Sequence, residues 1–166
     1  MHDATRAAGR PGLGAVMGSK NLKAVVVKGN VDKPLANPSS FAKARAEFAR
    51  ALMENPAAQE LGRYGTPGGI AEYMEKFGLI PTKNFREGVF DEINRITGET
   101  MANTILVGRE TCAGCPVRCK RVVKTAFGGE EVKPEYGGPE YETVAALGSL
   151  CMCSDLSAIA LANQKC

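Results

Sequence analysis

Tryptophan is absent from this 166-residue sequence, and histidine occurs only once, as His2. Because that one imidazole lies at the extreme N-terminus, the chain alone cannot build a catalytic histidine site or a histidine-rich metal site. No run of about 20 apolar residues is present, as a membrane-spanning helix would need, and the first residues lack the apolar core of a secretory signal. We therefore expect no membrane partner and no secretory leader.

A strong excess of either charge is missing as well. The sequence has 21 Lys and Arg against 18 Asp and Glu, a net charge of +3 that is too small and too dispersed to predict nucleic-acid binding. Hydrophobic residues make up 44% and charged residues 23% of the chain, which is the balance of a soluble globular protein rather than a disordered tail. The length allows one ordinary domain or parts of two.

The predicted fold class is α+β and mostly α-helical, in three stretches. Residues 1–29 are glycine-rich and end in the β-branched run Leu22–Lys28, which predicts a buried strand. Residues 30–36 form a linker, and residues 37–166 carry helical periodicity. The strand at the start has no neighbours and the last helical pattern has no stop signal, so we expect a piece of a longer protein.

Capping residues and apolar spacing predict the individual elements. Asn37 can cap a helix that has Pro38 in its first turn and runs to Glu54. Further helices are expected over residues 56–61, 70–77, 99–105 and 139–147, and from a cap at Ser154 or Asp155 to the end of the chain. A short strand is expected over residues 121–124, and residues 127–138 are interpreted as a loop.

Cysteine carries the clearest chemical signal. The sequence has six cysteines, and without a secretory signal an even count is weak support for disulfides. Three of them, Cys112, Cys115 and Cys119, lie within eight residues in the motif CAGCPVRC. This spacing lets thiolates turn onto one metal centre, and the neighbouring Arg and Lys residues would offset the negative charge of an iron–sulfur cluster.

The spacing alone leaves three interpretations of this motif open, namely an iron–sulfur cluster, a zinc site or three inert thiols. A cluster or a zinc ion needs a fourth ligand, either from another cysteine of the chain or from outside it. Cys151 and Cys153 flank Met152 in an apolar context, which predicts that both are buried free thiols.

A glycine-rich segment over residues 6–20 places four glycines among cations, and main-chain amides in such turns can bind a phosphate. The segment fails as a P-loop because Ser19 and Lys20 stand in the wrong order. It also fails as a dinucleotide fingerprint because its glycines precede the strand instead of following it. A phosphate-bearing cofactor and a tight turn into a strand both remain open.

Two carboxylates, Glu140 and Glu142, lie in the segment GPEYET over residues 138–143. Near a helix N-terminus they can simply complement the helix dipole. Alternatively, one of them points into a pocket and accepts or donates a proton. The residues alone do not decide between these two interpretations.

Four segments, in the same order, resemble the aldehyde ferredoxin oxidoreductase family: residues 6–29, PTKNF at 81–85, CAGCPVRC at 112–119 and GPEYETVAALGS at 138–149. The resemblance implies an oxidoreductase with a tungsten or molybdenum bis-pterin cofactor, magnesium that bridges the pterin phosphates, and one [4Fe-4S] cluster. It also implies that residues 1–29 end an N-terminal pterin-binding domain and that residues 37–166 are the first part of a helical domain.

The resemblance gives the N-terminal segment a role in binding the pterin. Arg6 and Ala7 fall where the family contacts the pterin phosphates, with a main-chain carbonyl, assigned to Ala7, directed to the magnesium. Gly9 and Arg10 continue that loop. Pro11 departs from the family pattern, which usually has Gly there, and this removes one amide donor.

The resemblance also assigns roles in the second part of the chain. Cys112, Cys115 and Cys119 match the first three cluster ligands, and the fourth ligand is expected outside this chain. One carboxylate of the GPEYET segment would lie at the substrate cavity as the catalytic residue. Glu140 and Glu142 are both candidates, and Glu140 is favoured.

The implied reaction is the oxidation of a small aldehyde to a carboxylic acid, with electrons passed to ferredoxin in an anaerobic cytoplasm. We expect the 166-residue chain alone to be inactive, and whether the protein forms a homo-oligomer stays open. Two alternatives are a non-enzymatic zinc or iron–sulfur module and a superfamily member that acts on an aromatic acyl-CoA.

Overall fold

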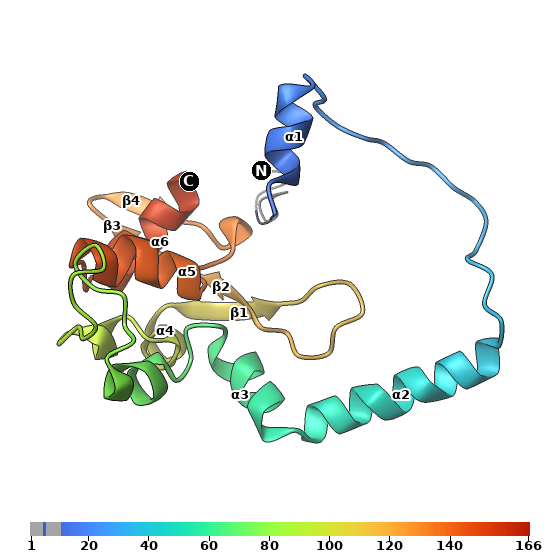
Figure 1. Ribbon diagram of the computed structural model, residues 1–166, viewed down its shortest axis with the longest axis horizontal. Coiled ribbons are helices and arrows are strands. Elements are labelled where there is room, and N and C mark those ends of the chain that lie inside the picture. The colour runs from blue at the N-terminus through green and yellow to red at the C-terminus, as the bar shows by residue number, and fades with distance from the viewer. Residues whose placement is uncertain (1–4, 6–10) are drawn as a thin grey trace. The chain divides into compact units, whose positions relative to one another are not determined.

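The computed structural model describes residue 5 and residues 11–166, which fall into two compact units (Figure 1). The first unit comprises residues 1–48 and the second comprises residues 49–166. The second unit contains the cysteine motif and both candidate carboxylates.

The first unit contains a short helix, α1 (Leu13–Ser19), an extended segment, and most of helix α2 (Pro38–Glu54). The predicted start of α2 is confirmed. The Ser40 amide donates a hydrogen bond of 3.0 Å to Asn37 Oδ1, and Pro38 occupies the first helical position, where its missing N–H costs no hydrogen bond.

Two predictions for this unit are wrong. Residues 22–28 are extended but unpaired, and Val26 and Val27 are 91% and 85% exposed, so the expected buried strand is not formed. A strand is stable only beside a neighbouring strand, and the described residues of this unit provide none. Residues 13–19, interpreted as part of a turn-rich segment, form helix α1 instead.

The second unit combines helices with two antiparallel hairpins. Its helices are α3 (Pro56–Tyr64), α4 (Gly98–Thr104), α5 (Tyr141–Thr143), which continues as a π-helical turn over Val144–Gly148, and α6 (Leu156–Lys165). Shorter helical turns cover Ile70–Met74, Glu75–Phe77, Ile93–Arg95, Pro134–Tyr136 and Ser149–Cys151. The strands are β1 (Leu106–Glu110) with β2 (Lys120–Val123), and β3 (Thr125–Phe127) with β4 (Glu130–Val132).

The core of this unit is formed by residues 70–101 together with the hairpins and the last helices. Its buried apolar side chains include Ile80, Phe90, Ile93, Ile96, Met101, Val123, Val132, Val144, Leu156 and Ile159. Helix α6 lies beside the β3–β4 hairpin, and Gln164 holds them together. Its Oε1 accepts a bond of 2.8 Å from the Lys133 amide, while its Nε2 donates one of 3.1 Å to the Glu131 carbonyl.

The α+β class is confirmed, with more helix than strand, but several local predictions differ from the structure. The loop expected over residues 127–138 is wrong, because β3 and β4 pair there. Gly128 and Gly129 form their two-residue turn with φ values of 60° and 85°, and two consecutive positive φ values are what a type I′ hairpin turn requires. Helix α3 also extends beyond the expected range of residues 56–61 and ends at Tyr64.

In the described part of the chain, no single helix has both the length and the apolar character that crossing a membrane requires. One bent pair, Tyr141–Cys151 with Leu156–Lys165, meets those criteria by length and composition alone.

Replacing Gly98 by alanine is expected to destabilise the second unit. Gly98 is buried at the first position of α4, and an added Cβ would meet the Tyr64 carbonyl oxygen and lie 2.7 Å from the Gly68 nitrogen, both of which are main-chain atoms. Overpacking of this kind costs about 1–3 kcal/mol. It reverses the gain of about 1 kcal/mol that Gly to Ala normally brings in a helix.

The Gly98→Ala prediction is checked by thermal unfolding of the whole protein, with Gly108→Ala as the matched control. A Cβ at Gly108 would lie 3.6 Å from Val122 Cβ, an ordinary contact, so the midpoint of that variant should stay near wild type. A Gly98→Ala midpoint at or above wild type would contradict the prediction.

Candidate functional site

The three clustered cysteines lie on one loop, residues 111–119, which joins β1 to β2 and is called the cysteine loop below. The hairpin pairs Glu110 with Lys120, so the loop starts and ends at adjacent positions on two paired strands. The predicted strand over residues 121–124 is confirmed with a shift of one residue, since β2 begins at Lys120, directly after Cys119. Strand β1, which forms the other side of the hairpin, was not predicted.

Hydrogen bonds fold the first half of the cysteine loop into a tight turn. The Cys115 amide donates to the Cys112 carbonyl at 3.0 Å, and the Thr111 hydroxyl donates to the Cys115 carbonyl at 2.6 Å. Gly114 has a φ of 76°, a conformation that side chains other than glycine rarely adopt. The turn therefore holds the main chain of the Cys-x-x-Cys pair in the compact form that such metal-binding motifs use.

The chemistry of these side chains fits a metal centre with sulfur ligands. Cys112 is exposed, while Cys115 and Cys119 are partly buried. Among the residues that the structure describes, no three metal-binding side chains already surround one point. Thiolates are ligands of both iron–sulfur clusters and zinc, so the chemistry of these three side chains fits either group.

The remaining cysteines lie outside this loop. The expectation that Cys151 is buried is wrong, because it is exposed at the end of a helical turn, where its Sγ donates to the Ala146 carbonyl at 3.2 Å. Cys153 is partly buried against the core, and Cys166 is exposed.

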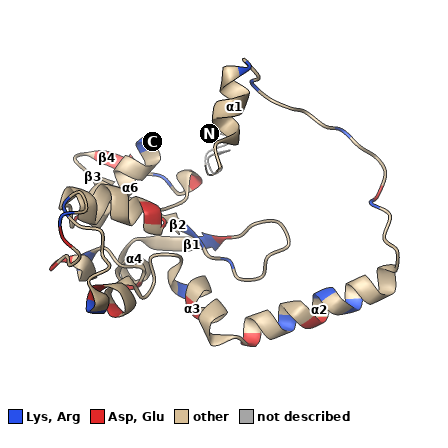
Figure 2. Ribbon diagram, in the orientation of Figure 1, with Lys and Arg blue, Asp and Glu red and all other residues tan. Residues whose placement is uncertain are grey.

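Lys and Arg residues lie at the ends of the cysteine loop. Figure 2 shows them at the ends of β1 and β2, the two strands that the loop connects. Arg118 is exposed and has a left-handed φ of 58°, and its guanidinium donates to the Arg109 carbonyl at 2.9 Å. Arg121, in contrast, is buried. Burial lowers its pKa, and the nearby Glu140 carboxylate opposes that shift.

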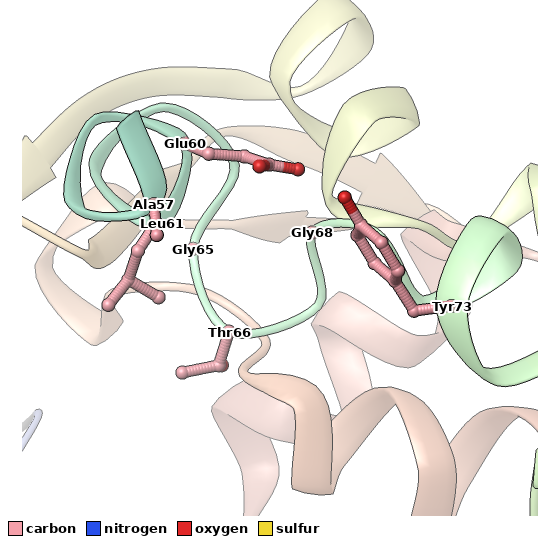
Figure 3. Close-up of a pocket in the computed structure, with 7 residues that line it drawn as sticks. All are labelled: Ala57, Glu60, Leu61, Gly65, Thr66, Gly68 and Tyr73. Carbon is pink, nitrogen blue, oxygen red and sulfur yellow. The ribbon is translucent and has the colours of Figure 1, made fainter. Parts of the chain in front are cut away.

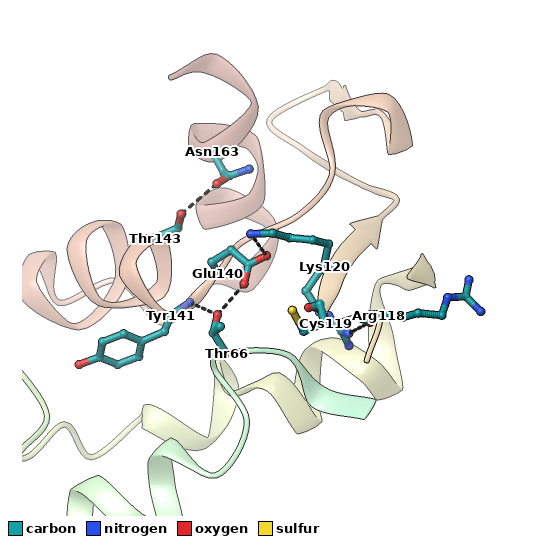
Figure 4. Close-up of polar contacts among 9 residues, drawn as sticks. Thr66, Arg118, Cys119, Lys120, Glu140, Tyr141, Thr143 and Asn163 are labelled. Atoms are coloured by element: carbon teal, nitrogen blue, oxygen red, sulfur yellow. Dashed lines mark hydrogen bonds and ion pairs between the residues drawn. The ribbon is translucent and has the colours of Figure 1, made fainter. Parts of the chain in front are cut away.

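Glu140 lies close to the cysteine loop, immediately before α5 (Figure 4). Its Oε2 accepts a hydrogen bond of 2.6 Å from the Thr66 hydroxyl, and its Oε1 lies 3.3 Å from Lys120 Nζ. The Tyr141 amide donates to the same Thr66 hydroxyl at 2.8 Å. Because Lys120 directly follows Cys119 in the chain, this ion pair connects the carboxylate to the end of the cysteine loop.

Glu142 has a different environment. It is exposed in the first turn of α5, where a carboxylate complements the helix dipole. The neighbouring Tyr141 is partly buried, and this burial raises the pKa of its phenol, with a smaller contribution from the charge of Glu142. The structure thus brings Glu140 into a hydrogen-bonded cluster with Thr66 and Lys120.

Thr66 also lines a cavity of about 210 Å³ between α3 and the turn that follows it (Figure 3). The other lining residues are Ala57, Glu60, Leu61, Gly65, Gly68 and Tyr73. In this view the Glu60 carboxylate points toward the Tyr73 side chain. Sequence reasoning missed Thr66, since the segment GTPGG indicates only a loop and its contact with Glu140 spans 74 residues.

Family models match most of the chain. The model for domains 2 and 3 of aldehyde ferredoxin oxidoreductase matches residues 43–166, and the model for the N-terminal domain of the same enzyme matches residues 1–29. The chain belongs to the aldehyde ferredoxin oxidoreductase family. The resemblance expected from its motifs is therefore confirmed.

Individual members of this family are similar along the whole chain. The tungsten-containing aldehyde ferredoxin oxidoreductase of Pyrococcus furiosus is 41% identical over 167 residues, which cover 100% of this chain and 27% of that protein. The enzyme of the same name from Thermococcus kodakarensis is 40% identical over the same shares. An aliphatic sulfonate oxidoreductase, WOR-like subunit, of P. furiosus is 32% identical over 150 residues, or 86% of this chain and 22% of that subunit. The chain thus spans about a quarter of the length of these aldehyde ferredoxin oxidoreductases.

The residues that the resemblance assigns to the pterin, Arg6, Ala7, Gly9 and Arg10, lie outside the described residues. Their role in this member of the aldehyde ferredoxin oxidoreductase family stays a prediction.

Proposed function

We propose that the whole protein is a tungsten oxidoreductase that oxidises an aldehyde to a carboxylic acid and passes the electrons to ferredoxin through a [4Fe-4S] cluster. The observation that carries this proposal is the 41% identity to a tungsten-containing aldehyde ferredoxin oxidoreductase over the whole chain. The three thiols on one hairpin loop support it independently, because that set of ligands suits an iron–sulfur cluster.

In this proposal the chain contributes to three sites. Cys112, Cys115 and Cys119 bind the cluster as thiolates, with a fourth ligand from outside the chain. The loop over residues 6–10 binds the pterin phosphates and, through the Ala7 carbonyl, their magnesium. Residues 1–29 then belong to the pterin-binding domain, residues 30–36 to a linker and residues 37–166 to the helical domain.

When bound, the tungsten bis-pterin supplies the two-electron redox chemistry at the aldehyde carbon, and the cluster carries electrons singly to ferredoxin. The protein contributes positioning and proton transfer. We assign proton transfer to Glu140, because general acid–base catalysis needs a held carboxylate close to the reacting group. Thr66 donates to Oε2 and Lys120 Nζ lies 3.3 Å from Oε1, and each carboxylate oxygen keeps a further acceptor site for a proton.

A second candidate keeps the cofactors and changes the substrate. The 32% identity to an aliphatic sulfonate oxidoreductase subunit supports it, since that protein acts on a sulfonate by name. Parallel assays of the same preparation with an aldehyde and with an aliphatic sulfonate separate the two candidates.

The proposal is tested on the whole protein, purified without oxygen. Tungsten, molybdenum, iron, zinc and acid-labile sulfide are measured first, and aldehyde-dependent reduction of ferredoxin is measured second. Tungsten with iron and sulfide, together with aldehyde-dependent reduction, is the expected result. Zinc as the only bound metal, without ferredoxin reduction, would overturn the proposal in favour of a non-enzymatic zinc module.

A further inference from the structure

Arg121 is a buried cation whose guanidinium holds two parts of the chain together. It lies on β2 and is 1% exposed. One nitrogen, Nη1, donates to the Arg63 carbonyl at 2.7 Å, and Nη2 donates to the Gly62 carbonyl at 2.9 Å. On the other side, Nη2 donates to the Arg118 carbonyl at 3.2 Å and Nε donates to the Cys119 carbonyl at 3.1 Å.

These four acceptors belong to two segments that are far apart in the sequence. The carbonyls of Gly62 and Arg63 lie in the last turn of α3, where carbonyl groups lack helical partners and carry partial negative charge. The carbonyls of Arg118 and Cys119 end the cysteine loop. A planar guanidinium with five donors can satisfy both groups at once, whereas a lysine ammonium lacks this fixed geometry.

Glycines make the space in which this guanidinium lies. A Cβ at Gly65 would lie 2.8 Å from Arg121 Nε, and a Cβ at Gly138 would lie 2.9 Å from Arg121 Cβ. A Cβ at Gly62 would lie 2.6 Å from the carbonyl oxygen of Val117, inside the cysteine loop. Helix α3 therefore touches the loop directly as well as through Arg121.

We propose that Arg121 is a positioning residue for the cluster: it fixes the main chain of Cys119 to helix α3 and keeps a permanent positive charge beside that cysteine. The inference rests on the proposed assignment of Cys112, Cys115 and Cys119 as cluster ligands. Two consequences can be separated. The hydrogen bonds govern how firmly the cluster is retained, and the charge raises its reduction potential, because a cation stabilises the more negative reduced form.

The test uses the whole protein with Arg121→Met, Arg121→Lys and, as control, Arg109→Met. Two readouts are the rate at which a chelator removes iron and the reduction potential of the cluster, followed by electron paramagnetic resonance. Arg121→Met should release iron faster, by about 10–100-fold if the loss of metal affinity usual for such supporting partners appears in the release rate, and should have a more negative potential. Arg121→Lys should keep much of the potential but still release iron faster.

Arg109 is the matched control because it reaches the same Gly62 carbonyl, at 2.9 Å, from an exposed position. Arg109→Met should match wild type in both readouts. A thermal midpoint that falls in Arg121→Met, with iron release and potential unchanged, would overturn the inference and leave Arg121 as a structural cap of α3.

Should Arg121→Met not fold, Gly62→Ala and Arg121→Lys decide the question. The added methyl of Gly62→Ala presses on Val117 in the cysteine loop and keeps the charge of Arg121, so iron should again be released faster. Wild-type release rates in both variants would overturn the inference. Wild-type protein that binds zinc and no cluster would instead refute the proposed function, on which the inference depends.

Discussion

Replacing Cys115 by serine in the whole protein is expected to remove the iron–sulfur cluster and with it ferredoxin-coupled turnover. Cys115 is the central thiol of the motif, partly buried, with its amide and its carbonyl both hydrogen-bonded inside the turn. Serine fits this geometry, but its hydroxyl is a poor substitute for a thiolate ligand of iron. The loss should therefore come from ligand chemistry and not from misfolding of the loop.

Iron, acid-labile sulfide and the visible absorbance of the cluster measure this effect. Cys151→Ser is the matched control, because Cys151 is also partnered by a main-chain carbonyl but is exposed and lies outside the cysteine loop. That variant should keep wild-type iron and absorbance, as it must if the fourth ligand comes from outside the chain. Full cluster absorbance in Cys115→Ser would refute the ligand assignment, and cluster loss in Cys151→Ser would move the fourth ligand into this chain.

The helices could be predicted where their signals are local. Asn37 and Asp155 both cap the helices that follow them, and each cap depends on side-chain and main-chain atoms within three residues. The same reasoning fails where a partner segment decides the outcome. Residues 22–28 have strong strand propensity, yet within the described part of their unit they find no strand to pair with.

The β3–β4 hairpin was missed for a different reason. Its strands have only three residues each, too few to show an alternating pattern. The Gly128–Gly129 pair was the available signal, since two consecutive glycines favour the turn of a tight hairpin.

The candidate site also has one part that could be predicted from local sequence and another part that depends on distant contacts. The three cysteines could be recognised in the sequence because the ligands of such a metal motif are closely spaced along the chain. The residues that support the site could not be recognised in this way. Arg121 donates hydrogen bonds to carbonyls 58 and 59 residues away, and Thr66 donates one to Glu140 across 74 residues. Only the folded chain reveals that α3, the cysteine loop and the start of α5 meet.

Replacing Glu140 by glutamine is expected to lower kcat for aldehyde oxidation by about 10²–10⁴-fold, the usual contribution of a general acid or base. Glutamine keeps the shape of the side chain and can still accept a hydrogen bond from Thr66, but it cannot take up a proton. Because Glu140 is not assigned as a metal ligand, iron, sulfide and tungsten contents should match wild type. Anaerobic steady-state kinetics with metal analysis of the same preparation measures both effects.

Glu142→Gln is the matched control for this experiment. The two glutamates are two residues apart and have the same chemistry. Glu140 is partly buried and contacts Thr66 and Lys120, whereas Glu142 is exposed on the first turn of α5. The control should therefore keep kcat close to wild type, since removing an exposed carboxylate near a helix N-terminus costs only about 0.3–1 kcal/mol of stability and removes no proton-transfer group. Wild-type kcat in Glu140→Gln combined with a large loss in Glu142→Gln would assign the proton-transfer role to Glu142.

Cofactor loss in Glu140→Gln would instead make Glu140 part of a binding site. Its ion pair with Lys120, the residue after Cys119, indicates the cluster as the group to examine first.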